Sequence, residues 1–491
     1  MSATVYLLGA GPGDGGLLTR KAEQLLTKAE VVVYDRLVGD DILALIPPQA
    51  ERINVGKHAG NHPVPQERIN EILLEKALEG KRVVRLKGGD GFLFGRGGEE
   101  LELLREHGIS FEVVPGVPSP IAAAAYAGIP VTHRDFCASV HFITGHRKAD
   151  GALNLDYEAL VRLNGTLVFL MSVATCGEIA SGLMSHGMSS EMDCAVIENG
   201  TRPEQRKFIA TVGTIAGVIQ EQRITSPALI VVGRVCSLSD RFDWFSELPL
   251  HGVSVLVTAP ATGSGRLEHQ LRELGAGVTV LPAIATVPLD VTLPELSGVR
   301  AVIFTSATGV RAVFSALLER GRDARMFGGV IIAAVGRETS EALRQYGILP
   351  DLVPPIFSGE ALGRELLERE LLKPGETALL LRAKKAAPGL PAVLKQAGVR
   401  VEELAVYETV ALPLEEINPV RYDWVTFTSA GCVESFRASC EGSGFFDFGS
   451  VNALCIGPQT AKSAQALGMK VSVSKKATLA SMAEFLKEAA V

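Results

Sequence analysis

Loops of small residues, each placed where a predicted strand ends, are the first candidates for chemistry in this 491-residue sequence. The central loop, Gly-Gly-Asp-Gly at 88–91, follows the apolar strand 83–86 and precedes a helix that begins near Gly97 with two acidic residues in its first turn. Glycine permits a positive φ and lets bare backbone approach a ligand. A strand that ends in a glycine loop and enters a helix forms a ligand-binding edge in α/β proteins, so this stretch predicts a small-molecule site.

Two further loops have the same placement. Gly-Ala-Gly-Pro-Gly-Asp at 9–14 resembles a dinucleotide fingerprint, but its third glycine comes two positions after the second instead of three, and Pro12 lacks a backbone donor. A Rossmann nicotinamide site is therefore excluded. The loop at 115–120 leads into an alanine-rich helix at 121–127, with Ser119 as its predicted N-cap and Pro120 as its first residue. Because the three loops end successive strands, we expect them to line one cleft.

Charged side chains near these loops supply candidate acid–base groups. Asp35 follows the predicted strand 31–34, and Lys57 lies in the next strand-end loop. Strand ends are where α/β proteins collect their functional groups, so a carboxylate and a cation here are suited to proton transfer. A helix cap or turn residue is the alternative role for Asp35.

Composition and element order describe the scaffold. Strands rich in Val, Ile and Leu alternate with helical stretches rich in Ala, Glu and Leu, which is typical of an α/β fold of several compact units at this length. The seven scattered cysteines include no Cys-x-x-Cys pair, so we predict reduced thiols in a cytoplasmic protein and no metal site. The net charge of −7 argues against a nucleic-acid partner, and no apolar run reaches membrane-spanning length.

The second half of the sequence contains an internal repeat, with an offset of roughly 120 residues, the size of one small domain. The corresponding segments are 253–258 with 378–382, 302–310 with 424–433, and 334–339 with 455–460. This half is therefore predicted to consist of two similar α/β lobes. Each repeat places Ser or Thr before a helix, where it can act as an N-cap or as an anion anchor.

From about Val5 to Trp244 the ordered motifs resemble the uroporphyrinogen-III C-methyltransferases of the tetrapyrrole methylase family. The opening Gly-x-Gly-Pro-Gly-Asp fits the wider family. The blocks that narrow it to the uroporphyrinogen branch are YDRLV at 34–38, VGK at 55–57, GGD at 88–90 and ENGT at 198–201. The resemblance implies a domain at 1–245 with lobes at about 1–132 and 133–245, which binds S-adenosylmethionine between the lobes and forms a homodimer.

The same resemblance implies the site residues of this half. Asp35 is the candidate base, and Lys57 the candidate acid or carboxylate anchor. The implied cofactor contacts are Pro12, Gly88, Gly89, Asp90, Leu93, Pro118, Ser119, Met171 and Gly200. Pro118 and Gly91 replace a common threonine and a common proline, so backbone contacts are expected there. Cations suited to the substrate carboxylates are Arg36, His58, Arg85, Arg96, Arg134 and Arg202.

From about Leu250 to Val491 the chain resembles uroporphyrinogen-III synthase. The resemblance implies one lobe at about 250–286 plus 409–491 and another at about 288–407, connected near 286–288 and 407–409. Tyr407 is implied as the cleft tyrosine that protonates the departing hydroxyl, whereas Ala259 replaces a common arginine. The implied substrate contacts, some of which could instead be helix caps only, are Ser306, Arg382, Ser429 and Thr460.

Together the two resemblances imply a bifunctional α/β enzyme, a two-lobed tetrapyrrole methylase followed by a two-lobed synthase. Hydroxymethylbilane would be cyclised to uroporphyrinogen III, which would be methylated twice, at C-2 and C-7, to precorrin-2. Two alternatives stay open: a second half that only binds tetrapyrroles as a regulatory module, and a first half that methylates another corrinoid or RNA. Siroheme and cobalamin are both open as destinations of the product.

Overall fold

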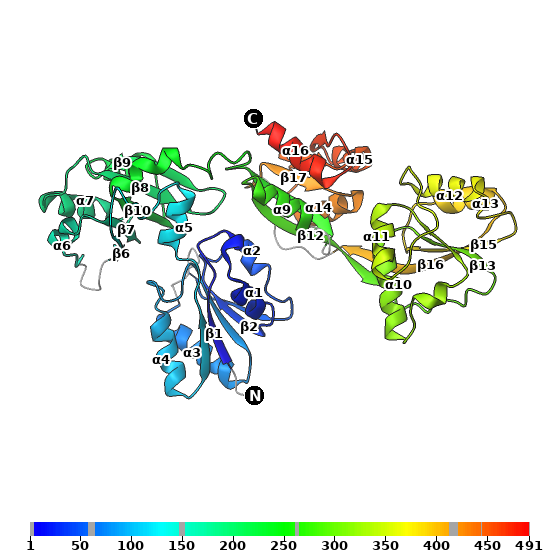
Figure 1. Ribbon diagram of the computed structural model, residues 1–491, viewed down its shortest axis with the longest axis horizontal. Helices are drawn as coiled ribbons and strands as arrows, with labels where there is room; N and C mark the ends of the chain where they lie inside the picture. The colour runs from blue at the N-terminus through cyan, green and yellow to red at the C-terminus, as the bar shows by residue number, and fades with distance from the viewer. Residues whose placement is uncertain are drawn as a thin grey trace. The chain divides into compact units, whose positions relative to one another are not determined.

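The computed structural model describes residues 4–56, 64–146, 153–260, 265–411, 421–442 and 444–490 (Figure 1). By its internal contacts the chain forms two compact units. The first comprises Met1–Val255, His269–Thr279 and Ala483–Val491, and the second comprises Leu256–Glu268 and Val280–Met482. The chain up to residue 232 contains two five-stranded sheets, and the second half of the chain contains one nine-stranded sheet.

The first lobe is a parallel sheet with helices on both faces. Its strand order is β3-β2-β4-β1-β5. The strands are β1 Thr4–Gly9, β2 Val31–Tyr34, β3 Glu51–Asn54, β4 Val83–Lys87 and β5 Ser110–Val114. The helices are α1 Arg20–Leu26, α2 Asp40–Leu43, α3 Gln66–Leu78 and α4 Gly97–Glu106. One face of the sheet packs on α1 and α2 and the other on α3 and α4. The central strands β2 and β4 are therefore buried on both sides, whereas the edge strand β3 is mostly exposed.

The second lobe is a mixed sheet in the order β6-β7-β10-β8-β9, in which β6 and β7 are parallel and the other neighbours antiparallel. The strands are β6 Val140–Thr144, β7 Thr166–Leu170, β8 Asp193–Glu198, β9 Arg206–Thr211 and β10 Ala228–Val232. Its helices are α5 Ser119–Tyr126, α6 Tyr157–Arg162, α7 Cys176–Ser185 and α8 Ile215–Glu221.

The alanine-rich helix α5 differs from expectation in two respects. Its alanines pack against strands of the second sheet, with Ala123 and Ala124 in the same core cluster as Val168. The chain therefore leaves the first lobe directly after β5, earlier than the boundary expected near residue 132. The helix also begins one residue earlier than predicted, so Pro118 is the N-cap and Ser119 is the first helical residue.

The nine-stranded sheet of the second half has the order β14-β13-β15-β16-β12-β11-β17-β18-β19. Its strands are β11 Ser254–Pro260, β12 Gly277–Pro288, β13 Val299–Phe304, β14 Ile331–Ala334, β15 Thr377–Ala383, β16 Arg400–Ala411, β17 Trp424–Phe427, β18 Asn452–Cys455 and β19 Lys470–Val473. Its helices are α9 Gly265–Glu273, α10 Ala307–Glu319, α11 Arg337–Gln345, α12 Gly359–Glu368, α13 Gly389–Gln396, α14 Ala430–Gly442, α15 Pro458–Ala466 and α16 Leu479–Ala489.

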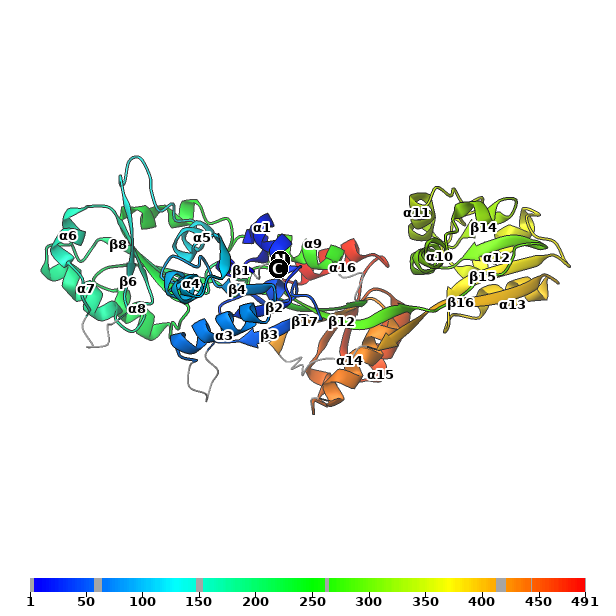
Figure 2. The ribbon, with the colours of Figure 1, turned by 90° about the horizontal axis from the view of Figure 1, so that it is seen from below.

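The strand order confirms the internal repeat. The run β14-β13-β15-β16 mirrors the run β18-β17-β11-β12, and β16 and β12 pair antiparallel between them. Helices α10 and α14 each have 13 residues, and α11 and α15 each have 9. Thr286 pairs with Thr409 and Pro288 with Tyr407, so the two segments expected to connect the lobes lie side by side (Figure 2).

The seven cysteines form no disulfide and, apart from Cys137, are buried, as expected for core thiols. Burial raises the pKa of the Cys176 thiol to about 11. Within the described ranges, no helix combines the length and the apolar composition needed to cross a membrane. The same part of the chain contains no group of three His, Cys, Asp or Glu side chains arranged to hold a metal ion.

Candidate active site

The glycine loops after β1 and β4 are locked together by their backbones. Gly11 N donates to the Gly89 carbonyl oxygen at 3.0 Å, and Gly89 N donates to the Gly11 carbonyl oxygen at 2.7 Å. Both residues have a left-handed backbone, with φ of +77° and +67°, which glycine adopts without steric cost. The spacing of glycines in these two loops therefore meets a conformational requirement.

The loop after β5 packs against the other two, so the three loops expected to share a cleft do lie together. A Cβ on Gly116 would stand 2.2 Å from the Gly89 carbonyl oxygen, and a Cβ on Gly9 would stand 2.3 Å from Gly116 N. The Asp90 carboxylate accepts two backbone hydrogen bonds within its own loop and a third from Gly116 N at 3.0 Å. Asp90, predicted as a cofactor contact, thus also ties the central loop to the third one.

The backbone at Gly89 has room beside it. Apart from its chain neighbours, a Cβ on Gly89 would have one atom of the described residues within 4 Å, the Ser119 amide nitrogen at 3.7 Å. Gly89 and Ser119 are both predicted cofactor contacts, and the structure brings them next to each other. The other predicted contacts that lie in these three loops are Pro12, Gly88, Asp90, Leu93 and Pro118.

Two predicted cofactor contacts come from the second lobe. Met171 follows β7 and is 48% exposed. Gly200 follows β8 and packs on α5, where a Cβ would stand 2.2 Å from Cβ of Ala123. The glycine at 200 is therefore required by the packing of its turn, a reason that the sequence pattern did not indicate.

Left-handed backbone conformations concentrate in the loops of this site. Five non-glycine residues there have φ between +52° and +69°, namely Phe94, Arg96, Met171, Asn199 and Thr201. Each such residue costs about 1–3 kcal/mol and persists where the surrounding structure fixes it, as at active sites. The residue types give no signal of this strain, so sequence reasoning missed it.

Asp35 lies at the end of β2 and is held by a buried arginine. Arg85 Nη2 donates to Asp35 Oδ1 at 2.9 Å, and the side chains are 2% and 30% exposed, respectively. In the sheet Val33 pairs with Arg85, and alternation along β2 places Asp35 on the same face. The turn that contains Asp35 also packs on the central loop, since a Cβ on Gly88 would stand 2.8 Å from Cβ of Leu37.

Arg85 belongs to a buried charge cluster and not to the rim of the site. Its Nε donates to Glu100 Oε1 at 3.1 Å, and Lys87 Nζ donates to the same oxygen at 2.7 Å. Its Nη1 donates to the carbonyl oxygens of Val33 at 3.4 Å and Leu86 at 3.2 Å. The expectation that Arg85 binds a substrate carboxylate is therefore corrected, because its guanidinium is buried and occupied by protein acceptors. Burial, with the neighbouring charge of Arg85, lowers the pKa of Lys87 although Glu100 opposes this.

The remaining predicted cations have varied surroundings. Arg36 and Arg134 are exposed. Arg96 is also exposed and forms a two-point contact with Glu99, at 2.9 and 2.6 Å. Lys57 and His58 lie outside the described residues.

Hydrogen bonds connect the loop after β1 with the second lobe. The Asp14 carboxylate accepts from the Tyr126 hydroxyl on α5 at 2.5 Å, and Asp14 N donates to Thr201 Oγ1 at 3.2 Å. Burial, reinforced by Asp14, raises the pKa of Tyr126. Arg202, a predicted substrate contact, donates from Nη2 to the Leu37 carbonyl oxygen at 3.1 Å. The site loops are thus fixed to both lobes, and Tyr126 is a contributor that the sequence did not indicate.

In the second half, Ser306 and Tyr407 are brought together. Ser306 Oγ caps α10 by accepting from Gly309 N at 3.0 Å, and it lies 3.0 Å from the Tyr407 hydroxyl. The Ser306 side chain is therefore a helix cap and also a partner of the predicted catalytic tyrosine.

Arg382 does not fit its predicted role as a substrate contact. It is buried, with Nη1 donating to Glu403 Oε2 at 2.7 Å and Nη2 to the Ala387 carbonyl oxygen at 2.5 Å. We correct that expectation because these partners occupy the guanidinium. In the other repeat, Ser429 Oγ accepts from Cys432 N at 3.3 Å at the start of α14, and Thr460 is buried in the first turn of α15.

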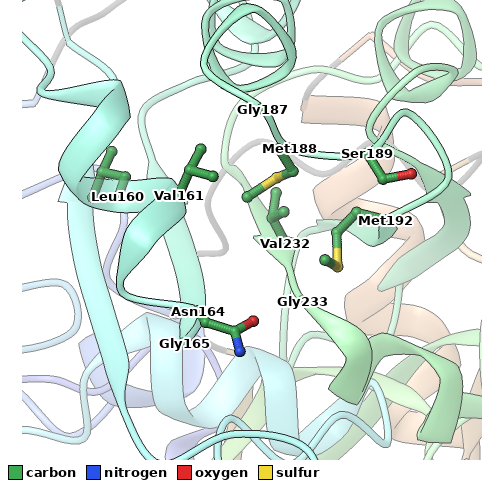
Figure 3. A pocket seen from close by; sticks show the side chains of 10 residues that line it. All are labelled: Leu160, Val161, Asn164, Gly165, Gly187, Met188, Ser189, Met192, Val232 and Gly233. Carbon is green, nitrogen blue, oxygen red and sulfur yellow. The ribbon is translucent and has the colours of Figure 1, made fainter.

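A pocket of about 180 Å³ lies apart from these residues, in the second lobe of the first half (Figure 3). Apolar side chains of Leu160, Val161, Met188 and Met192 form much of its lining. Its lining includes none of the residues predicted to bind cofactor or substrate.

The first half of the chain has two α/β lobes with strand-end loops, the arrangement expected of a methylase. The second half is an α/β sheet with an internal repeat. The family model of the tetrapyrrole (corrin/porphyrin) methylases matches residues 4–216, and that of uroporphyrinogen-III synthase HemD matches residues 265–484. The porphyrin biosynthesis protein HemD of Ruminiclostridium josui is 44% identical over 497 residues, which cover 99% of this chain and 97% of that protein. The chain belongs to this family, in which a tetrapyrrole methylase is joined to a uroporphyrinogen-III synthase.

Other relatives match about half of the chain. The siroheme synthase of Escherichia coli is 53% identical over 243 residues, which cover 50% of this chain and 52% of that protein. A uroporphyrin-III C-methyl transferase of Thermus thermophilus, solved with S-adenyl homocysteine, is 39% identical and covers 48% of this chain and 100% of its own, with a TM-score of 0.42. The two domains make this chain an enzyme of tetrapyrrole biosynthesis.

Proposed function

We propose that the second half cyclises hydroxymethylbilane to uroporphyrinogen III and that the first half methylates this product twice, at C-2 and C-7, to precorrin-2. The family memberships of the two halves support the pair of activities, because one half makes the substrate of the other. The observation that carries the methylation step is the position of Asp35, a partly exposed carboxylate at a strand end whose turn packs on the central glycine loop.

The three loops fit S-adenosylmethionine as the methyl donor. The backbone at Gly89 has open space beside it, next to Ser119, so a ligand can approach main-chain atoms there without meeting a side chain. The exposed Met171, whose own backbone is left-handed, would add a contact from the second lobe. Bound there, S-adenosylmethionine would supply an electrophilic methyl group for transfer to a ring carbon.

The chain's own part in methylation is to orient the substrate and remove a proton. Positioning accounts for most of the expected rate, because a ring carbon has to approach the methyl group in line. Once the new carbon–carbon bond has formed, the ring carries a positive charge and must lose a proton. Asp35 is the candidate acceptor, and a base so placed contributes on the order of 10²–10⁴-fold. Exposed arginines such as Arg36 and Arg134 are candidates for binding the substrate carboxylates, together with Lys57 and His58.

For ring closure we propose that the Tyr407 hydroxyl protonates the departing hydroxyl group of hydroxymethylbilane. The Ser306 hydroxyl at 3.0 Å supports this role, because it can hold the phenol in one orientation. The Ser429 hydroxyl, at the start of α14, is a candidate anchor for the carboxylates of the linear substrate. Thr460 lies in the first turn of α15, where a backbone amide can serve the same purpose.

We further propose that the first half forms a homodimer and that the protein is cytoplasmic. Exposed apolar side chains at Leu37, Phe92 and Phe94, in or beside the site loops, support an interface with a second copy. The unpaired cysteines support a reducing compartment. Sedimentation analysis would test the dimer, since a monomer at micromolar concentration would contradict it.

Substitution of Asp35 tests the methylation site. Asp35→Ala is expected to retain S-adenosylmethionine binding and to slow methylation of uroporphyrinogen III about 10²-fold or more, because the proton acceptor is lost. Steady-state rates and calorimetry on the same preparation would separate the two effects. Near wild-type turnover of this variant would contradict the assignment of Asp35.

A further inference from the structure

The charged residues behind Asp35 form a cluster that a stable core does not require. Arg85, Lys87 and Glu100 are 2%, 4% and 0% exposed, on a sheet face otherwise packed with aliphatic side chains of β1, β2, α3 and α4. Removing such charges from water is costly, and well-packed apolar residues in their place are often as stable or more so. A role in the site accounts for their presence better than a role in stability.

The cluster holds Arg85 in one orientation. Four contacts fix its guanidinium, with Glu100 at Nε, two backbone carbonyl oxygens at Nη1 and Asp35 at Nη2. Glu100 Oε1 is itself fixed by three donors, since Gln66 Nε2 approaches at 3.2 Å in addition to Arg85 and Lys87. A planar guanidinium held by three contacts at two of its nitrogens is a rigid donor for the fourth contact.

One buried atom shows that the hydrogen bonds of this cluster are not arranged for maximum stability. Glu100 Oε2 is buried and has no hydrogen-bond partner among the described residues. An unsatisfied buried carboxylate oxygen is destabilising, typically by more than a neutral polar atom. Glu100 thus directs its bonding through Oε1 toward Lys87 and toward Arg85, the residue that contacts Asp35.

We propose that Arg85, oriented by Glu100 and Lys87, is a positioning residue that holds Asp35 Oδ1 and presents Oδ2 for proton removal from the substrate. This inference rests on the proposed role of Asp35 as the base. Arg85 does not touch the substrate, so its effect on turnover passes through Asp35 alone.

Arg85→Lys tests the inference, because lysine keeps the charge but lacks the planar fork that joins Glu100 to Asp35. The variant is expected to lower kcat for methylation about 10–10²-fold, since a small displacement of a catalytic group has an effect of this size. KM for uroporphyrinogen III and the affinity for S-adenosylmethionine should remain within about twofold of wild type. Arg68→Lys, which alters an exposed ion pair on α3 with Glu75, is the matched control and should leave kcat unchanged.

A double-mutant cycle separates positioning from general damage to the fold. If Arg85 acts through Asp35, Arg85→Lys will cause no further loss of kcat in the Asp35→Ala background. Glu100→Gln, which keeps the side-chain volume, should behave the same way and serves if Arg85→Lys fails to fold. A loss that persists in the Asp35→Ala background, or wild-type kcat in the variants at Arg85 and Glu100, would overturn the inference. Wild-type kcat in Asp35→Ala alone would instead contradict the proposed function.

Discussion

At the scale of single residues, the site combines the partly exposed carboxylate of Asp35 with buried charges behind it and glycine backbone beside it. Asp35 was predicted as a site residue from its place at a strand end and from the family resemblance, and the structure adds a hydrogen bond to it from Arg85. Gly89 was recognisable from its loop, and the structure shows why glycine is needed there. Its φ of +67° is left-handed, and its backbone bonds to Gly11 in both directions.

Gly89→Val is expected to abolish S-adenosylmethionine binding and to leave ring closure by the second half intact. A β-branched residue is strained at this φ, and its side chain would extend into the space beside Ser119. Calorimetric titration with S-adenosylmethionine measures the effect. Gly98→Ala in α4 is the matched control, because a Cβ there meets no atom of another described segment within 4 Å. Wild-type affinity in Gly89→Val would mean that the central loop does not bind the cofactor.

Tyr407→Phe is expected to slow cyclisation of hydroxymethylbilane about 10–10²-fold, because the phenol that protonates the leaving group is removed. The product should remain mainly the type III isomer, since the shape of the site and not one hydroxyl directs ring inversion. Tyr346→Phe is the control, as that ring stacks on Phe314 at 4.2 Å in the same lobe. An unchanged rate of closure in Tyr407→Phe would exclude the tyrosine as the acid.

At the scale of helices and strands, the repeat and the connecting segments could be predicted, because matching strand–helix units leave matching patterns in the sequence. The segments 286–288 and 407–409, which the sequence predicts as the connections between the lobes, lie on two strands that pair with each other. The partners of buried cations could not be predicted. From the sequence, Arg85 and Arg382 were predicted to be available to the substrate. Their partners Glu100 and Glu403 lie on other elements, so the sequence did not show that these arginines are paired. The lobe to which α5 belongs was also missed, since an alanine-rich face fits either sheet.

Glu198, at the end of β8, is the first residue of the ENGT block at 198–201, and its contacts show that it stabilises the fold. Its carboxylate accepts from Thr225 N at 2.7 Å, from Thr225 Oγ1 at 2.9 Å and from Arg206 Nε at 2.7 Å. Burial raises the pKa of Glu198, but these hydrogen bonds outweigh burial and the pKa is lowered. The folded pKa therefore lies below the unfolded value of about 4.3. The carboxylate stabilises the fold above the unfolded pKa, and that stability is lost as pH falls through the folded pKa.

Glu198→Gln should accordingly lower the free energy of unfolding of the first half by about 1–3 kcal/mol at pH 7. The difference between variant and wild type should shrink as the pH falls from about 5 through the lowered pKa, because the wild-type carboxylate becomes protonated. Denaturant unfolding at several pH values measures both quantities. A difference that stays constant down to pH 3 would show that the ionised carboxylate is not the stabilising form.

At the scale of the whole chain, the residues proposed for methylation and those proposed for ring closure belong to different compact units. Asp35, Gly89 and Ser119 lie in the first unit, and Ser306, Tyr407 and Ser429 lie in the second. Substitutions in one group are therefore expected to spare the other activity. The proposed reactions also explain why the two domains are joined, because uroporphyrinogen III is the proposed product of one half and the proposed substrate of the other.

The most direct test of the central claim is to incubate the purified full chain with hydroxymethylbilane, with and without S-adenosylmethionine, and to identify the tetrapyrroles by chromatography and mass spectrometry. Without S-adenosylmethionine we expect the protein to form uroporphyrinogen III faster than the linear substrate closes spontaneously. Spontaneous closure gives the type I isomer, in which the last ring is not inverted. With S-adenosylmethionine we expect conversion to precorrin-2. Type I product alone would show that the second half does not catalyse closure, and type III product that stays unmethylated would contradict the methyltransferase assignment.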